Sequence, residues 1–358
     1  MTRVQFGVGI YTGEPLPHIV EQARLAEHLG YDTLWLLDSQ LAGRELYTTM
    51  ALCALETSRI KIGSGVTQSH TRQAAVTANA FATLDSLAPG RFLLGIGRGD
   101  SAVLGVGGSL PSFRDFAAYV RQVETLLRGE PVDLDGHAAR LTGVDPAHPV
   151  VAPVYIAADG PRSLESACAI ADRVIMHPGA GQGMLARAMG LLQAGAHKAG
   201  KSPLEMEVVW WMHTSIHADW SKVKEHYRPR MAGTFRHLRG GTLEELGVSI
   251  DAETFERARA AYDFSDHATA GAAHGAWADL FPDEAWKQLA LLGTADEAYA
   301  TVSRGLDAYP EISHVVINPP ASGFGITIEG IMQTFAGDVM PRLQQPPLPL
   351  GEGRPSVP

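Results

Sequence analysis

The segment RFLLGIGRGDSAVLGVGG, from Arg91 to Gly108, begins with an apolar run and continues with many glycines. Glycine costs conformational entropy and weakens regular structure, so this density predicts that a ligand or another backbone comes close. Among the glycines, Asp100 could act as a general acid or base, and Arg98 could hold an anion by charge-assisted hydrogen bonds. Two alternatives remain open, namely a mobile loop without a ligand and an ion pair between Arg98 and Asp100.

A second segment with binding chemistry is AADGPRSLESA, which predicts a helix that starts between Gly160 and Ser163. Proline and serine suit the first turn of a helix, and the free N–H groups and dipole there attract anions. Combined with Arg98 from a neighbouring strand end, this helix start predicts a phosphate-binding site. The alternative is that Ser163 only caps its helix, while Arg98 pairs with Asp100 or Asp159.

Two other kinds of motif carry no function in this interpretation. The segment from Gly97 to Ala102 matches a dinucleotide-binding fingerprint, but that fingerprint needs a helix that starts at the glycines. The next helix is expected only after Pro111, so the match is interpreted as accidental. The sequence has no CxxC and no HExxH pattern, and a metal site is therefore not expected.

Alternating strand-like and helix-like segments must position these residues. Eight mostly continuous apolar runs are typical of a parallel sheet covered on both faces, and each is followed by a helical pattern. The expected strands are residues 4–11, 32–38, 59–67, 91–97, 153–159, 173–178, 207–217 and 314–319. Eight such units favour a closed (β/α)8 TIM barrel with insertions over the alternative, a doubly wound open sheet.

The same pattern predicts the domain organisation. We expect one barrel domain over residues 1–343. An Asp135-Gly136 turn signal predicts a hairpin inside a first insertion near 129–149, and an irregular polar stretch marks a second near 240–290. The Pro- and Gly-rich tail at 344–358 is expected to be disordered.

The strand ends predict where the active site lies, because a TIM barrel carries its site at the carboxyl ends of its strands. These ends are polar and glycine-rich and hold no lysine. They are Ile10-Tyr11, Asp38-Ser39, Ser64–Thr67, Gly97–Ser101, Ala157–Gly160, Met176-His177, His213–Ser215 and Asn318-Pro319. Within this set, Asp100 is the first candidate acid or base, and Asp38, His177 and His213 are weaker candidates.

Composition narrows the function class. The formal net charge is −10 and no cluster of Lys and Arg occurs, which argues against a nucleic-acid partner and favours small-molecule chemistry. Only two cysteines occur, and both fall in helical patterns, as expected for reduced core residues of a cytoplasmic protein. No apolar run approaches about 18 residues, so no membrane span is expected.

Three segments carry a resemblance to a known family. The segment SGVTQSHTRQAAVTANAFATLDSLAPGRFLLGIGRGDS strongly resembles the luciferase-like flavin and deazaflavin oxidoreductases. The similarity continues through PVYIAADGPRSLESACAIADRVI and LLGTADEAYATVSRGLDAYPEISHVVI, and so it covers nearly the whole chain. It is greatest to the branch with methylenetetrahydromethanopterin reductase and the F420-dependent glucose-6-phosphate dehydrogenase.

The resemblance implies a flavin or deazaflavin ring at the carboxyl rim of the barrel, covered by an insertion region. It places a cis peptide bond at Ser64–Gly65 against the back of the ring, with Val66 and Thr67 following along the cofactor. It also places Asp100 at the position of an acid. The cofactor-binding residues expected on this basis are Asp38, Ser64, Gly65, Val66, Thr67, Arg98, Gly99, Ala157, Asp159, Gly160 and Ser163.

The function implied is coenzyme F420-dependent hydride transfer to or from a small organic substrate. The alternatives are an FMN-dependent monooxygenase and a non-catalytic flavin-binding homologue. Ser39 stands where the sugar-phosphate branch has a catalytic histidine, so glucose-6-phosphate activity is not expected. Only the branch similarity favours F420 over FMN, and the resemblance also implies a homodimer or a larger homo-oligomer.

Overall fold

The computed structural model describes residues 3–238, 242–243, 246–248, 250–260, 278–279 and 281–344. The tail predicted to be disordered, at 344–358, lies outside the described residues except for its first residue. Much of the predicted insertion at 240–290 lies outside them as well.

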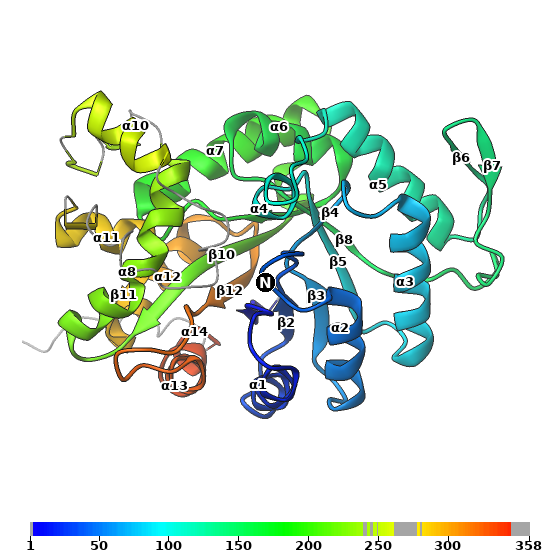
Figure 1. Cartoon of the computed structure of the whole chain (residues 1–358). Helices are drawn as coiled ribbons and strands as arrows, with labels where there is room; N and C mark the ends of the chain where they lie inside the picture. Colours follow the sequence, from blue (N-terminus) through cyan, green and yellow to red (C-terminus); the bar gives the residue numbers. More distant parts are fainter. Residues whose placement is uncertain are drawn as a thin grey trace, which may run out of the picture.

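Eight parallel strands close into a barrel, as the sequence predicts (Figure 1). They are β1 (Gln5–Ile10), β2 (Thr33–Leu36), β3 (Lys61–Ser64), β5 (Phe92–Gly97), β8 (Val154–Ala157), β9 (Arg173–Met176), β10 (Glu207–Ile216) and β12 (Ile312–Asn318). Neighbouring strands pair in this order, and β12 pairs again with β1 to close the ring. In a ring of eight strands, β12 therefore lies across the barrel from β5.

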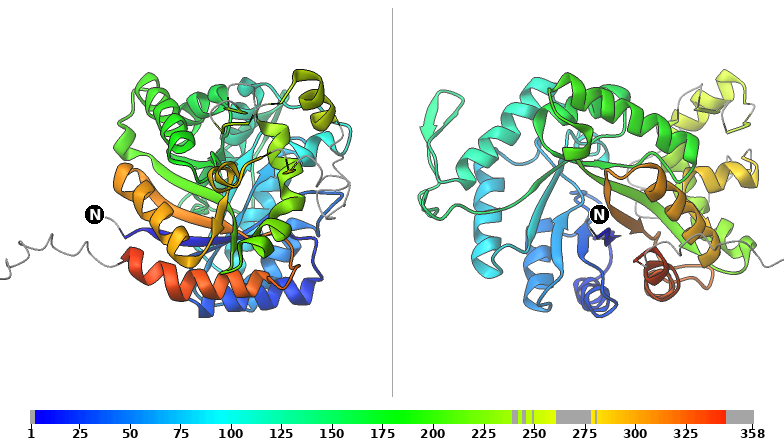
Figure 2. Two further views of the ribbon diagram at one scale, coloured as in Figure 1. Left: turned by 90° about the vertical axis from the view of Figure 1, so that its left-hand side faces the viewer. Right: turned by 180° about the vertical axis from the view of Figure 1, so that it is seen from behind.

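Helices surround the barrel on its outside (Figure 2). They are α1 (Leu16–His28), α2 (Leu46–Leu55), α3 (Ala74–Leu87), α5 (Phe113–Leu127), α6 (Pro161–Ile170), α7 (Gln182–Lys198), α12 (Ala295–Ala308) and α13 (Ile328–Thr334). A π-helical segment (Phe335–Val339) and α14 (Met340–Gln344) continue α13. None of the described helices is long and apolar enough to cross a membrane.

Local sequence signals set several of these boundaries. Gly30, just after the end of α1, has a φ of +85°, the left-handed conformation that glycine adopts without steric cost. At the start of α12, Thr294 Oγ1 accepts a hydrogen bond from Glu297 N (3.2 Å), and Glu297 Oε2 accepts one from Thr294 N (2.8 Å). This reciprocal capping box is encoded by the sequence TADE.

Two insertions lie outside the eight-stranded barrel. The predicted hairpin is present as β6 (Val132–Leu134) and β7 (His137–Ala139), with φ of 53° at Asp135 and 85° at Gly136 in its turn. It projects away from the barrel (Figure 1). On the other side, α8 (Trp220–His237), α10 (Ala252–Ala260) and α11 (Asp283–Leu289) follow β10, and a short strand, β11 (Leu291–Gly293), pairs with the end of β10.

Glycines on the barrel strands make room for two tryptophan rings inside the barrel. A Cβ atom on Gly63 would lie 2.3 Å from the ring of Trp35, and one on Gly9 would lie 2.3 Å from the ring of Trp211. The two rings meet edge to face at 6.4 Å between centroids. Part of the glycine pattern thus serves interior packing, and Trp211 lies in the layer nearest the candidate site.

Candidate active site

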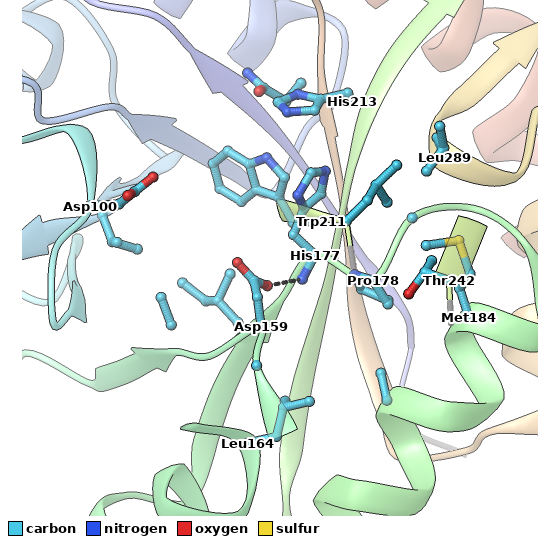
Figure 3. A pocket seen from close by; sticks show the side chains of 18 of the residues that line it. Asp100, Asp159, Leu164, His177, Pro178, Met184, Trp211, His213, Thr242 and Leu289 are labelled. Carbon is cyan, nitrogen blue, oxygen red and sulfur yellow. Dashed lines mark hydrogen bonds between the residues drawn. The ribbon is translucent and has the colours of Figure 1, made fainter. Parts of the chain in front are cut away.

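A cavity of about 520 Å³ opens at the carboxyl ends of the strands, where the sequence predicts the site (Figure 3). Its apolar lining comes from the barrel interior and includes Leu37, Val66, Ala157, Ile175 and Trp211. Trp211 is only 7% exposed, and its ring packs edge to face against the ring of Trp35 in the barrel interior. A broad apolar floor of this kind suits a flat aromatic ligand.

One wall of the cavity is polar and comes from three neighbouring strands, β9, β10 and β12. His177 follows β9, and its ring meets that of His213 edge to face at 4.4 Å between centroids. His213 pairs in register with Asn318 at the end of β12. Figure 3 shows His177 and His213 beside Trp211. The sequence names all three as strand-end residues, but it marks only the two histidines as candidates for chemistry.

The amide of Asn318 is held in one orientation. Its Nδ2 donates a hydrogen bond to the carbonyl oxygen of Gly9 (2.8 Å). Its Oδ1 is buried and accepts no hydrogen bond from the described residues. Buried polar atoms are rarely left unsatisfied in this way, and each case needs an explanation.

Asp100 lines the cavity at the end of β5. The chain turns at Gly99, whose φ is +95°, and the carbonyl of Asp100 then accepts the N–H groups of Val103 and Leu104. These bonds form a short helix, α4 (Ser101–Leu104), so the expectation that no helix begins before Pro111 is wrong. The turn depends on the backbone at one glycine, and four residues are too few to show a helical period.

Only one of the two predicted halves of the phosphate site lines the cavity. Gly160 and Pro161, at the start of α6, line the cavity, whereas Arg98 is not among the lining residues. Arg98 Nε instead donates to the carbonyl of Pro111 (2.8 Å), and its guanidinium lies 4.1 Å from the centroid of the Phe113 ring. The aromatic and carbonyl contacts draw Arg98 toward α5.

Ser163 and Asp159 make contacts that shape the rim. Ser163 Oγ accepts from Gly160 N (3.0 Å) and donates to the Gly160 carbonyl (2.9 Å), which is the capping alternative considered from the sequence. Asp159 lines the cavity, and its Oδ1 accepts the backbone N–H of His177 (2.7 Å), as Figure 3 shows. This bond ties the end of β8 to the end of β9.

Two arginines outside the predicted binding set line the cavity, Arg187 of α7 and Arg230 of α8. Burial lowers the pKa of Arg230, although an arginine stays protonated at neutral pH. Both residues lie on helices and are therefore absent from the set of strand ends. No group of three or more His, Cys, Asp and Glu side chains that could hold a metal ion occurs within the described part of the chain.

Asp38 belongs to a buried ion pair. Its Oδ2 accepts from Arg72 Nη1 (2.6 Å) and from Thr67 Oγ1 (2.7 Å), and its Oδ1 accepts from Gln40 (2.8 Å). Arg72 also donates to Glu45. Burial alone would lower the pKa of Arg72, but the hydrogen bond and charge of Asp38 raise it. Asp38 is not among the residues that line the cavity, and no sequence motif marks Arg72.

The cis peptide bond occurs one residue later than the resemblance implies. It joins Gly65 to Val66, so the expected position at Ser64–Gly65 is wrong. The amide of Gly65 still donates to the carbonyl of Leu36 (2.8 Å), which continues the pairing of β3 with β2. The chain therefore leaves the strand only after Gly65, and a short strand, β4 (Thr67–Gln68), then pairs with β5.

The sequence of this chain is similar to those of known enzymes. A family model described as luciferase-like monooxygenase matches residues 1–308. The chain is 30% identical to the 5,10-methylenetetrahydromethanopterin reductase of Methanolobus tindarius, over 84% of this chain and 90% of that protein. It is 28% identical to the F420-dependent glucose-6-phosphate dehydrogenase of Amycolatopsis mediterranei, over 91% of this chain and 94% of that protein.

Solved structures share the fold. The coenzyme F420-dependent tetrahydromethanopterin reductase of Methanopyrus kandleri superposes with a TM-score of 0.77 at 23% identity, covering 95% of this chain and 99% of that one. The FMN-containing type II Baeyer–Villiger monooxygenase of Pseudomonas putida reaches 0.68 at 14% identity, covering 96% and 100%. The match to the family model over most of its length shows that this chain belongs to the luciferase-like monooxygenase family.

Proposed function

We propose that this chain is an oxidoreductase that binds coenzyme F420 in the cavity over Trp211 and transfers a hydride to or from a small organic substrate. The observation that carries the proposal is the cavity itself, with its apolar floor, its polar wall and its position at the strand ends. The choice of F420 is supported by relatives whose names specify F420-dependent or methylenetetrahydromethanopterin chemistry.

The residues around the cavity fit such a cofactor. Val66 and Trp211 offer apolar surface to a flat ring, and Gly65 adds no side chain to the wall beside them. Backbone N–H groups at the start of α6 suit an anionic arm, since that helix end lines the cavity. Arg187 of α7 also lines the cavity and adds positive charge to it. Asn318 Oδ1, which lacks a partner among the described residues, leaves a hydrogen-bond acceptor in the cavity for the second reactant.

The contacts in the structure refine the predicted binding set. Gly65, Val66, Ala157, Asp159 and Gly160 line the cavity and remain the proposed cofactor contacts. The remaining members are assigned supporting roles, because their side chains or backbones are engaged within the barrel wall or the rim. These are Asp38, Ser64, Thr67, Arg98, Gly99 and Ser163.

When bound, the deazaflavin ring would supply two-electron hydride chemistry, while the protein orients the reactants and handles the proton. We assign proton transfer to Asp100, because its carboxyl group lines the cavity and Asp38 does not. His177 and His213 line the cavity on another wall, and we propose that they contact the second reactant. Trp211 and the apolar residues around it exclude water from the floor.

Separate titrations with F420 and FMN test the proposal. We expect the purified full-length chain to bind F420 with a Kd near or below about 1 μM, roughly −8 kcal/mol of binding free energy, and FMN at least about tenfold more weakly. Quenching of the cofactor fluorescence measures both. Tight binding of FMN alone would favour the monooxygenase alternative, and failure of both to bind at micromolar concentration would remove the basis of the proposal.

Homodimer formation and a cytoplasmic location belong to the same proposal. The first rests on family resemblance. The second is supported by the two cysteines, Cys53 and Cys168, which are buried and form no disulfide. Burial raises the pKa of Cys53 to about 12, which keeps this thiol protonated and unreactive at neutral pH.

A further inference from the structure

We propose that Asn318 determines substrate specificity, because its Oδ1 accepts a hydrogen bond from an O–H or N–H group that the substrate carries near its reacting carbon. The inference rests on the proposed function, in which the cofactor binds on the side of the cavity opposite Asn318. It names a chemical class of substrate, one with a hydrogen-bond donor such as an alcohol, an amine or an amide.

The orientation of the amide is decided by its neighbour. The carbonyl of Gly9 can only accept, so the group that faces it at 2.8 Å must be the Nδ2 of Asn318. A flipped amide would set two oxygens against each other. Oδ1 is therefore an acceptor held in a fixed place, in a side chain that is 1% exposed and that lines the cavity.

Gly9 makes this arrangement possible. A Cβ atom at Gly9 would lie 3.2 Å from Asn318 Nδ2 and 2.3 Å from the ring of Trp211. The bare backbone of β1 thus lets the amide and the indole ring pack against the same strand. The polar group is held rigidly beside the apolar floor, which is the arrangement that gives orientation and specificity in small-molecule sites.

The position of Asn318 indicates that its partner is the substrate. The proposed cofactor contacts lie on β3, β8 and the segments that follow them, and Asp100 follows β5. Asn318 ends β12, which is four strands away from β5 in either direction around the barrel. His213, in register with it on β10, extends the polar surface on that side.

The chemistry of an isolated acceptor defines what it selects. A ketone without an N–H group near its carbonyl has no hydrogen to donate. A bound ketone therefore leaves Asn318 Oδ1 without a hydrogen bond. An alcohol of the same size fills this need, and a site built around such a bond discriminates strongly against analogues that lack the donor. The wall should therefore bind an alcohol more tightly than the matching ketone.

Cyclohexanol and cyclohexanone are matched probes for this test. We expect the F420-loaded full-length chain to bind the alcohol about tenfold more tightly than the ketone, measured by NMR shifts of the Trp211 indole N–H. In Asn318→Leu the ratio should fall to about 1. In Asn318→Asp a preference for the alcohol should remain only where the carboxyl group is protonated and donates to the carbonyl of Gly9, because an ionised carboxylate would set two oxygens against each other. Asn79→Leu, at an exposed position on α3, is the matched control and should leave the ratio unchanged.

Two outcomes would overturn the inference. An unchanged alcohol-to-ketone ratio in Asn318→Leu would show that Oδ1 does not select the donor. A loss of F420 affinity in the same variant beyond about threefold would assign Asn318 to the cofactor instead, while the proposed function would stand. If the unaltered chain binds no F420, the proposed function fails, and the probe ratio measured without cofactor still decides the role of Asn318.

Discussion

Replacement of Arg72 by methionine is expected to lower the free energy of unfolding by about 3–5 kcal/mol, because it leaves a buried carboxylate without its counter-ion. The side chain of Asp38 is only 2% exposed and that of Arg72 only 12%. The lost pair also anchors Thr67, which donates to the same carboxylate oxygen and follows the Gly65–Val66 segment of the cavity wall. We therefore expect cofactor affinity to fall together with stability.

Urea denaturation followed by circular dichroism measures this effect, and two further variants control it. Glu45→Gln removes the second carboxylate on Arg72, but this side chain is 52% exposed, so the expected loss is below about 1 kcal/mol. The double variant Asp38→Asn/Arg72→Met removes both charges and should recover much of the loss. A single Arg72→Met variant no less stable than Glu45→Gln would show that Asp38 does not depend on its partner.

Replacement of Asp100 by asparagine is expected to lower kcat by about 10²–10⁴-fold, the range that positioned acid–base groups contribute. The two side chains have nearly the same shape, and the helix-forming contacts at this position use the backbone carbonyl of Asp100. The fold and the cofactor affinity should therefore change little, with the F420 Kd within about threefold of the unaltered chain.

Steady-state rates of F420 reduction with cyclohexanol as the hydride donor, measured beside F420 titrations, separate these effects. Asp307→Asn, at an exposed position on α12, is the matched control and should leave kcat unchanged. If Asp100→Asn retains more than a third of the activity, the proton must come from another group in the cavity. His177 and His213 would then be the next residues to replace.

Much of the fold was predictable because it follows from short-range patterns. Continuous apolar runs, helical periodicity and glycine or proline stops define the eight units, and the Asp135-Gly136 pair alone marks the hairpin. The strand ends then locate the cavity without knowledge of any contact, since all parallel strands of a barrel end on one rim.

The side-chain partners were not predictable in the same way. The pair of Asp38 with Arg72 joins residues 34 positions apart through the packing of two different loops. Arg98 lies in a predicted binding segment, but its guanidinium donates to the carbonyl of Pro111 and lies over the ring of Phe113. Such choices depend on the three-dimensional surroundings, which no local spacing encodes.

A crystal structure of the full-length chain grown with F420 tests the central claim most directly. The account predicts electron density for a flat tricyclic ring in the cavity over Trp211, beside Gly65 and Val66, with its phosphorylated arm at the start of α6. The claim would be contradicted by density that places F420 elsewhere on the protein, or by a cavity that holds only solvent at saturating F420.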